Sequence, residues 1–498
     1  RGRSSDDDDE TSGDDDSDDD DAGDDDTGDD DTGDDDDDTP IPSTTLRILA
    51  PLPSSTATLF VTLAAHIDGE TPGLARWTLD GAVIAEEFFA LSTGNTDVVV
   101  DSAAWQDGAH TIGIEAPAWS LSDSVVVTFA NGDLLRYDLG TLPYSYGADD
   151  PDSLELTLVP PAISMQQQVS PAPGEPFEYL AGYALNPDGD WALGGADTSI
   201  YPVGAAFGAP WAGGIPNHPN VPFLTGRYLL YPWGDASSDG DTMHVEALVK
   251  RAFAEPEAGL LDLDVYLVNG VTTAAANAPN HAGMQGFLDA LEQVYLQADI
   301  GLGAIRYFDL PAGNLLVVDG YAEMSALIGQ GVASDDRVLN LFVVNDINLP
   351  GSDPLGVASH IPGPALVNGT SQAGVVIVDQ YIQSAEPGTA AALAGHEIGH
   401  FLGLYHGTEI GGAVSDPLGD TPVACDGGGC WATNLMDPYL FGDTTLTVDQ
   451  RWVLHRHPLV RLVEASALPA RAARGAVDGA DGLPAGTPAS RFCGVGSR

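Results

Sequence analysis

Three histidines and a glutamate lie close together near residue 400, at a spacing that could hold a metal ion. His396 and His400 are four residues apart, so on a helix both imidazoles project from one face. Gly403 can end that helix in a left-handed conformation, and the reversed chain would then return His406 as a third nitrogen ligand. Three neutral imidazoles with one open position suit a catalytic zinc ion. Glu397 is placed to act as the general base on a zinc-activated water.

The elements that must position this cluster alternate between strands and helices, which predicts a mixed α/β (α+β) domain over residues 255–461. A helix should begin near Thr389, whose side chain could cap it after Pro387. A capping-box pattern at Thr447–Gln450 should open a last helix. The other expected strands are 261–268, 305–310, 338–344 and 375–378, and a helix should bury Met284, Phe287, Leu288, Leu291, Val294 and Tyr295.

Two β-rich modules are expected before this domain. Residues 46–132 hold short apolar runs about ten residues apart, separated by Asp-Gly and Asn-Gly turns, which favours an antiparallel sandwich. Stretches such as 77–81 and 107–112 resemble the immunoglobulin-like modules of bacterial surface proteins. Residues 133–254 are also strand-like and rich in Pro and Gly, so we predict a second β module there. The predicted fold class is therefore two sandwich-like β modules followed by a mixed domain.

Charge is distributed unevenly along the chain. The 498 residues carry a net charge of −58, and residues 1–45 repeat Asp runs that predict a disordered linker. Residues 462–498 should form a low-complexity tail. So acidic a chain is a poor partner for nucleic acid or an anionic membrane. No apolar run reaches the roughly 18–20 residues that span a bilayer, so no membrane span is expected.

Cysteine and lysine are both scarce. The pair Cys425 and Cys430 brackets a Gly-rich loop that could close into a disulfide in an oxidising compartment, which would leave Cys493 unpaired. Lys250 is the single lysine, and either halophilic adaptation or a GC-rich genome would produce this bias. We expect any lipid or surface tether to lie upstream of Arg1.

The histidine cluster, extended by Gly403 and His406, resembles the zinc signature of the metzincin metallopeptidases. The resemblance implies a Met-turn, which Asn434–Pro438 fits, with Met436 as the apolar floor beneath the zinc. The family usually has a tyrosine two positions after this methionine, able to bind zinc or the oxyanion. Here Tyr439 stands at the third position, which departs from the pattern.

Within the metzincins the chain is most similar to the pappalysins. Asp416 followed by Asp420-Thr421-Pro422 resembles a loop that this family associates with structural calcium. Two carboxylates, a hydroxyl and loop carbonyls supply the hard oxygens that calcium prefers, although a plain Asp-type turn would read the same way. Residues 355–358 resemble the upper-rim edge strand, and an exposed edge there could take an extended peptide.

These observations predict a zinc-dependent endopeptidase that hydrolyses peptide bonds of a protein or peptide substrate, secreted or held at a bacterial cell surface. The alternative is a surface binding or adhesion protein, in which the β modules do the work and the zinc domain is structural or inactive. Chelator-sensitive peptide cleavage separates the two.

Overall fold

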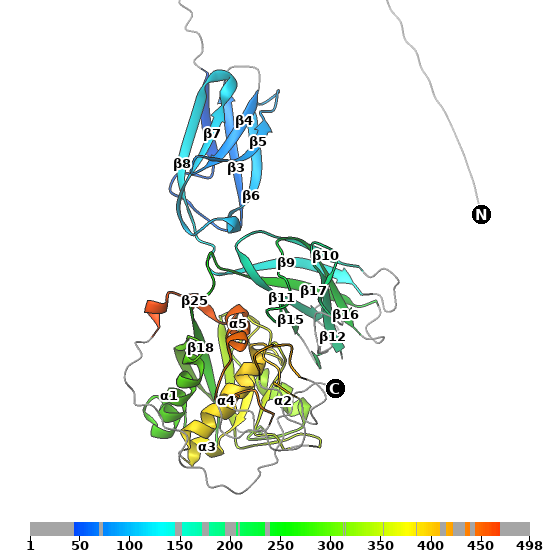
Figure 1. Ribbon diagram of the computed structural model, residues 1–498, viewed down its shortest axis with the longest axis vertical. Coiled ribbons are helices and arrows are strands. Elements are labelled where there is room, and N and C mark those ends of the chain that lie inside the picture. Colours follow the sequence, from blue (N-terminus) through cyan, green and yellow to red (C-terminus); the bar gives the residue numbers. More distant parts are fainter. Residues whose placement is uncertain are drawn as a thin grey trace, which may run out of the picture.

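The computed structural model describes residues 44–68, 73–144, 152–171, 179–194, 206–207, 210–234, 240–311, 313, 315–351, 353–384, 386–408, 415–421, 434–438 and 444–468. Within these residues β-sheet predominates, and several sheets pair into sandwich-like layers, which confirms the expectation of multiple β domains. Figure 1 shows three bodies in chain order, with the first module standing on the second and the second lying beside a part that contains helices.

The first module is built from two facing sheets. The strand orders are β1-β3-β6 and β2-β8-β7-β4-β5, and all pairs are antiparallel except the short β2–β8 pair. The strands are β1 (Thr45–Ala50), β2 (Thr56–Ala57), β3 (Phe60–Asp68), β4 (Leu74–Leu79), β5 (Ala82–Phe88), β6 (Asn95–Asp101), β7 (Gly108–Ala116) and β8 (Leu121–Phe129). Alternating residues such as Leu63, Trp77 and Ile112 are buried between the sheets, as a period of two requires.

The second module is also a pair of sheets, ordered β15-β11-β17-β9 and β10-β16-β12-β13, with β14 beside β12. Its strands are β9 (Leu134–Pro143), β10 (Leu154–Leu158), β11 (Ala162–Pro171), β12 (Tyr179–Leu185), β13 (Trp191–Leu193), β14 (Ala206–Phe207), β15 (Trp211–Ile215), β16 (Gly226–Gly234) and β17 (Thr242–Arg251). Met165, Val245 and Tyr228 lie in the core between the two sheets. β11 is buried along six successive residues, so both of its faces are covered.

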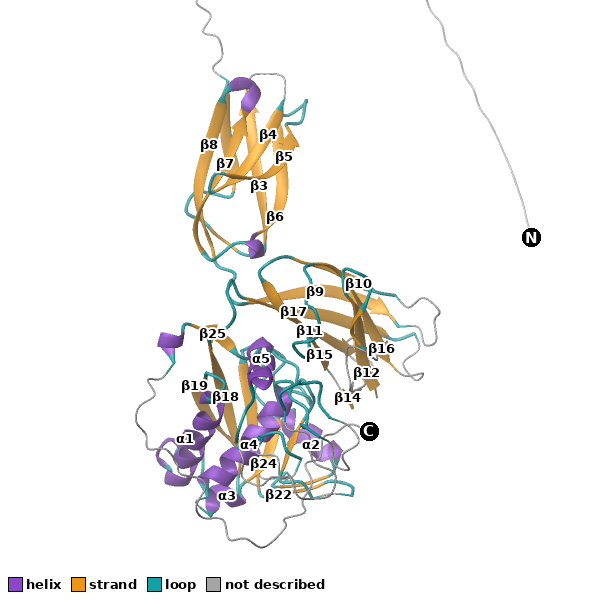
Figure 2. Cartoon of the chain, in the orientation of Figure 1, coloured by secondary structure: helices purple, strands orange, loops and turns teal. Residues whose placement is uncertain are grey.

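The third part is a mixed sheet with helices packed against it (Figure 2). The sheet order is β19-β18-β21-β24-β23, where β23 pairs antiparallel and the others pair parallel, and β25 joins β18 antiparallel. Its strands are β18 (Ala258–Val268), β19 (Ile300–Leu310), β21 (Val338–Val344), β23 (Gly356–Ala358), β24 (Val375–Val378) and β25 (Arg461–Val463). A separate parallel pair joins β20 (Val317–Asp319) to β22 (Asp346–Asn348).

The helices of this part are α1 (Ala282–Leu296), α2 (Tyr321–Ile328), α3 (Gln380–Gln383), α4 (Pro387–Phe401) and α5 (Val448–Arg456). The six apolar residues predicted on one helix face are all buried in α1. Tyr295 Oη on α1 donates to the carbonyl of Gly395 on α4 at 2.8 Å, which ties the two helices together. The capping box predicted at Thr447–Gln450 is present at the start of α5.

Two sequence expectations about element ends are wrong. α4 begins at Pro387, so Thr389 lies inside the helix and does not cap it. Proline is favoured in the first helical turn because its missing N–H would be unsatisfied there in any case. The mixed part also extends past residue 461, because Leu462 and Val463 of β25 pair with β18 and are not part of a tail.

The second module and the mixed part share buried hydrogen bonds. Ser164 Oγ on β11 donates to the carbonyl of Arg456 at 2.7 Å. Lys250 on β17 is fully buried, and its Nζ donates to the carbonyl of His457 at 2.8 Å and to that of Val460. Burial lowers the pKa of Lys250 well below its usual value, and separating the two parts would break both of these hydrogen bonds.

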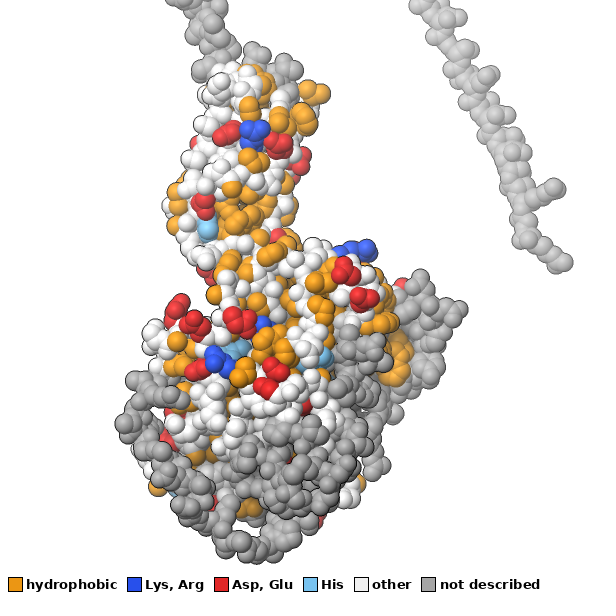
Figure 3. Space-filling view, in the orientation of Figure 1, with side chains coloured by type: hydrophobic (Ala, Val, Ile, Leu, Met, Phe, Trp, Pro, Cys, Tyr) orange, Lys and Arg blue, Asp and Glu red, His pale blue; other side chains and the backbone are white. Residues whose placement is uncertain are grey.

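The described surface carries acidic side chains on each of the three bodies, as Figure 3 shows for one face. Among the described residues, no helix is long and apolar enough to cross a membrane.

Candidate metal centre

The three predicted histidines come together at the end of α4. His396 and His400 lie on the last two turns of the helix, and the chain reverses at Gly403, whose φ is +106°. A residue with a side chain would be strained at that angle, so glycine permits the turn. His406 then returns to the pair, as the sequence predicted.

The Nε2 atoms of the three rings converge. His406 Nε2 lies 3.1 Å from His400 Nε2 and 3.3 Å from His396 Nε2. A tetrahedral ion with metal–nitrogen bonds of about 2.0–2.1 Å separates its ligand nitrogens by about 3.3–3.4 Å. Among the described residues, this triad is the only set of three or more His, Cys, Asp or Glu side chains whose ligand atoms all lie within 4.8 Å of one another.

Backbone carbonyls fix the far side of two of these rings. His396 Nδ1 bonds to the carbonyl of Leu435, and His400 Nδ1 bonds to the carbonyl of Leu404, both at 2.7 Å. A carbonyl only accepts, so both Nδ1 atoms carry the proton and both Nε2 atoms of the neutral rings present lone pairs. Metal-ligating histidines are usually oriented in this way.

The electrostatics of the triad also fit a bound cation. Burial, with a smaller contribution from His406, lowers the pKa of His396 to about 3, and burial lowers the pKa of His400 well below its usual value. The neutral His396 and His400 rings therefore present Nε2 lone pairs at short range to His406 Nε2. A metal ion between the three nitrogens would accept these lone pairs.

Glu397 lies beside the triad and is held by the edge of the sheet. The backbone N–H of Ala358 on β23 donates to Glu397 Oε2 at 2.9 Å. A Cβ on Gly356 would stand 2.6 Å from Glu397 Cγ, so this strand can approach the helix only with glycine at that position. The carboxylate is therefore oriented by a backbone amide.

Met436, predicted as the apolar floor beneath the zinc, packs against Gly399 of α4. It is fully buried, and its Sδ stands 2.7 Å from where a Cβ on Gly399 would be. Asn434 Oδ1 accepts from the Met436 N–H at 2.9 Å, and its side-chain amide exchanges two hydrogen bonds with that of Gln450. Because Gln450 also closes the capping box of α5, the last helix positions the Met436 turn.

Two of the residues predicted to bind calcium, Asp416 and Thr421, are in contact, and Asp420 lies near Asp416. Thr421 Oγ1 donates to Asp416 Oδ1 at 2.5 Å, while Asp416 Oδ2 is buried without a hydrogen-bond partner. Burial, with Asp420 and Asp449 nearby, raises the pKa of Asp416 to about 6. Asp420 Oδ2 accepts from the N–H of Asp449 at 3.0 Å. An unpaired buried carboxylate oxygen among further carboxylates could hold a cation.

One expectation about access to the site is wrong. Residues 356–358 form an edge strand, but Val357 and Ala358 are at most 1% exposed, so the edge is buried. On one side it packs against Glu397 and Leu393 of α4. Tyr439, Cys425 and Cys430 lie outside the described residues, so the proposed oxyanion donor and disulfide remain predictions.

Several groups that shape the site carry no sequence signal. The Leu404 and Leu435 carbonyls and the Ala358 N–H act through the backbone, which any residue supplies. Asp449 stands 29 residues after Asp420, and only the turn before α5 brings the two together. The exception is Gln450, because the capping-box pattern singles it out.

No family model and no curated protein matches the chain. Among solved structures, an endo-β-1,4-mannanase from Thermotoga petrophila is 19% identical over 18% of this chain and 20% of its own, with a TM-score of 0.17. β-Glucuronidase 3 from Bacteroides uniformis is 9% identical over 41% of this chain and 24% of its own, with a TM-score of 0.14. The CBM51-2 and INT domains of ZmpB from Clostridium perfringens are 8% identical over 51% of this chain and 57% of their own, with a TM-score of 0.15.

The chain thus spans a quarter or less of the first two of these proteins. Likeness at such TM-scores carries no argument about fold or function, so the proposals below rest on the residues of this chain.

Proposed function

We propose that the chain is a zinc-dependent endopeptidase of the metzincin type, most similar to the pappalysins. The observation that carries the proposal is the convergence of His396 Nε2 and His400 Nε2 on His406 Nε2, at 3.3 and 3.1 Å, beside a glutamate fixed by an edge-strand amide. This arrangement combines a nitrogen ligand set with a positioned base, which metal-assisted hydrolysis requires.

His396, His400 and His406 would hold the ion through Nε2. A bound zinc ion supplies Lewis acidity, which lowers the pKa of water and polarises a peptide carbonyl. The Leu435 and Leu404 carbonyls keep the His396 and His400 rings in the tautomer that offers Nε2, and Met436 closes the apolar floor.

Glu397 moves the proton. The Ala358 N–H fixes Oε2, which restricts rotation of the carboxylate, and the Glu397 carboxylate takes a proton from the attacking water. The same carboxyl group then delivers this proton to the leaving nitrogen, so one residue serves as base and then as acid. The role requires Glu397 to stay close to the ligands, which its place on α4 ensures.

The test is cleavage of a mixed peptide library by the full chain, together with metal analysis. We expect about one zinc per chain, cleavage that stops with a chelator, and recovery when zinc is restored. His400→Ala should lose both metal and cleavage. Cleavage that continues undiminished in metal-free protein would contradict the proposal.

Burial favours a second candidate function, a binding protein with a structural metal. The three histidines are 0–2% exposed, and the edge strand is covered. Structural sites are typically closed, whereas catalytic sites keep one position open. This candidate predicts one tightly bound zinc, no cleavage at all, and binding to a surface or carbohydrate that residues 46–254 retain alone.

We also propose calcium at Asp416, Asp420 and Thr421, with Asp449 as a further carboxylate. The support is the unpaired Asp416 Oδ2 and the raised pKa of its carboxyl group, which a bound divalent cation would reverse. Calcium should raise the melting temperature of the full chain at pH 7, and Asp416→Asn should abolish that shift. An identical shift in the variant would contradict this site.

For the location of the enzyme, we propose secretion or display at a bacterial cell surface. The acidic run of residues 1–45 supports this as a solvated spacer between a surface and the folded part. Labelling of intact cells with an antibody to the first module tests it, since a cytoplasmic protein would stay unlabelled.

A further inference from the structure

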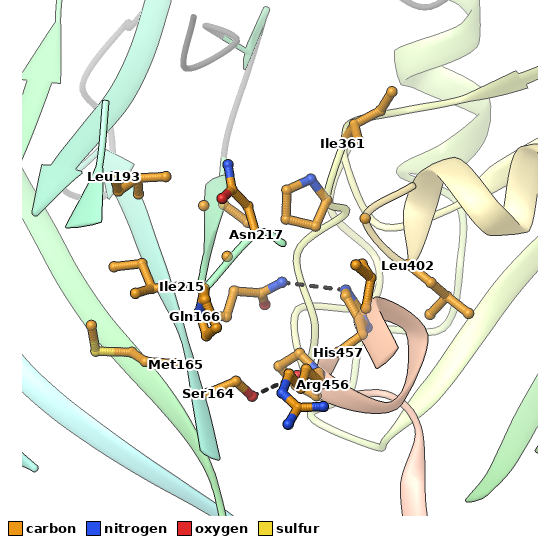
Figure 4. Close-up of a pocket in the computed structure, with 18 of the residues that line it drawn as sticks. Ser164, Met165, Gln166, Leu193, Ile215, Asn217, Ile361, Leu402, Arg456 and His457 are labelled. Carbon is orange, nitrogen blue, oxygen red and sulfur yellow. Dashed lines mark hydrogen bonds between the residues drawn. The ribbon is translucent and has the colours of Figure 1, made fainter. Parts of the chain in front are cut away.

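A pocket lies between the second module and the mixed part (Figure 4). About 620 Å³ of space, including that at its mouth, is free of atoms. One wall comes from β11, β13 and β15 of the second module. The other comes from the loop after β23, the turn after α4 and the end of α5. The side chains that set its character are Trp211, Ile215, Asn217, Ile361, Pro362 and Leu402.

In the sequence, residues that line this pocket lie close to residues of the metal centre. Its lining residue His360 stands two residues after Ala358, whose N–H orients Glu397. Two residues of chain span at most about 7 Å. Gly403 and Tyr405, which also line the pocket, belong to the turn that connects His400 with His406. A peptide extended past Glu397 would therefore reach the pocket within a few residues.

The walls of the pocket are fixed by buried glutamines. Gln166 on β11 donates from Nε2 to the carbonyl of Gly363 at 2.9 Å and accepts from the Ala365 N–H at 3.1 Å. Gln168 donates to the carbonyl of Ala365 at 2.8 Å. Both side chains are at most 3% exposed, so the loop that carries Ile361 cannot separate from the second module without breaking buried hydrogen bonds.

The chemistry of the lining selects an apolar group next to a hydrogen-bond donor. Figure 4 shows Leu193 and Asn217 of the second module on one side, and Ile361 and Leu402 on the other. Asn217 Oδ1 is buried without a hydrogen-bond partner, so it lacks a donor. A large apolar side chain would fill the apolar part of the pocket, and the backbone N–H beside it would donate to Asn217 Oδ1. An extended peptide offers both groups wherever it carries a large apolar residue.

We propose that this pocket is a substrate subsite, which takes a large apolar side chain two to four residues from the scissile bond while Asn217 Oδ1 accepts from a substrate N–H. The proposal rests on the proposed peptidase function. It makes the second module part of the substrate site and not an appendage to it.

The test fills the pocket from the second module's side. A Cβ on Gly214 of β15 would meet only Pro362 Cγ, at 3.5 Å, so Gly214→Val fits the strand and places its methyl groups toward the pocket. We expect the full chain to prefer Leu or Phe over Ala at one position by ~10- to 100-fold in kcat/KM. Gly214→Val should reduce this preference at least tenfold and leave Ala-containing peptides unaffected. Thr157→Val, exposed on β10, is the matched control and should change nothing.

Asn217→Leu provides a second variant, which keeps the volume and removes the acceptor. It should lower kcat/KM for all peptides several-fold without altering the Leu-to-Ala ratio. A wild-type preference that Gly214→Val leaves intact would overturn the subsite, and an unchanged kcat/KM in Asn217→Leu would overturn the acceptor role of Asn217.

Peptide binding separates this proposal from the peptidase function. The Glu397→Gln full chain is titrated calorimetrically with matched Leu and Ala peptides, with and without Gly214→Val. Tighter binding of the Leu peptide that Gly214→Val removes supports the pocket even if the wild type does not cleave. Cleavage without such a preference contradicts the pocket alone. If the peptides are neither bound nor cleaved, both proposals are contradicted.

Discussion

The two β modules are both paired antiparallel sheets, but they are attached in different ways. The first meets the second at one end, where Arg251 donates to the carbonyl of Trp105 and to Asp107. The second shares a buried face with the mixed part, where Lys250, Gln166 and Gln168 bond to backbone carbonyls. Both junctions are buried, because Arg251 is only 3% exposed and Ala103 of the first module joins the core of the second. The second junction carries the larger set of buried side-chain to backbone hydrogen bonds, so we expect the first module to be the more separable of the two.

The largest effect should come from removing each module in turn. Residues 133–498 should still fold and bind one zinc ion. Residues 255–498 should not, because removal of the second module takes Leu248 out of the core of the mixed part and exposes that apolar face to water, in a domain of marginal stability. Far-UV circular dichroism melts check this. Cooperative melting of residues 255–498 near the melting temperature of the full chain would contradict the claim that the mixed part needs the second module.

Acid should loosen the second junction through His457. Burial lowers its pKa to about 3, so the stability it contributes is present above pH 6.5 and is lost as the pH falls toward 3. At pH 4.5 this group should cost about 3 kcal/mol relative to pH 7. Urea unfolding at both pH values should show a steeper loss for the wild type than for His457→Gln. Equal losses would show that His457 does not carry this dependence.

A substitution of Lys250 tests the second junction at neutral pH. Lys250→Met leaves the His457 carbonyl without this buried donor, which should lower the free energy of unfolding by about 2 kcal/mol. The matched change in the first module is Arg76→Met, which breaks the exposed pair with Glu86 and should cost at most about 0.5 kcal/mol. Urea titrations of both variants measure the difference, and similar values for the two would count against it.

Local patterns in the sequence predict part of this structure well. The buried face of α1, the turn at Gly403 and the capping box before α5 follow from short-range spacing. The start of α4 was misplaced because Thr389 offers a cap and Pro387 offers a first turn, and the proline position prevailed.

Long-range packing is what the sequence cannot supply. Gln166 and Gln168 follow a strand pattern in which polar residues normally face water, yet here they face another domain. The lysine at position 250 would be expected on the surface, and it is fully buried. Both depend on partners about 200 residues away, at a junction that no local motif marks.

The central claim is that Glu397 moves the proton at a histidine-bound zinc, and Glu397→Gln tests it most directly. The amide keeps the side-chain shape and removes the base. We expect the full-length variant to retain about one zinc per chain while peptide cleavage falls at least ~100-fold. Near-wild-type cleavage by the zinc-loaded variant would contradict the account.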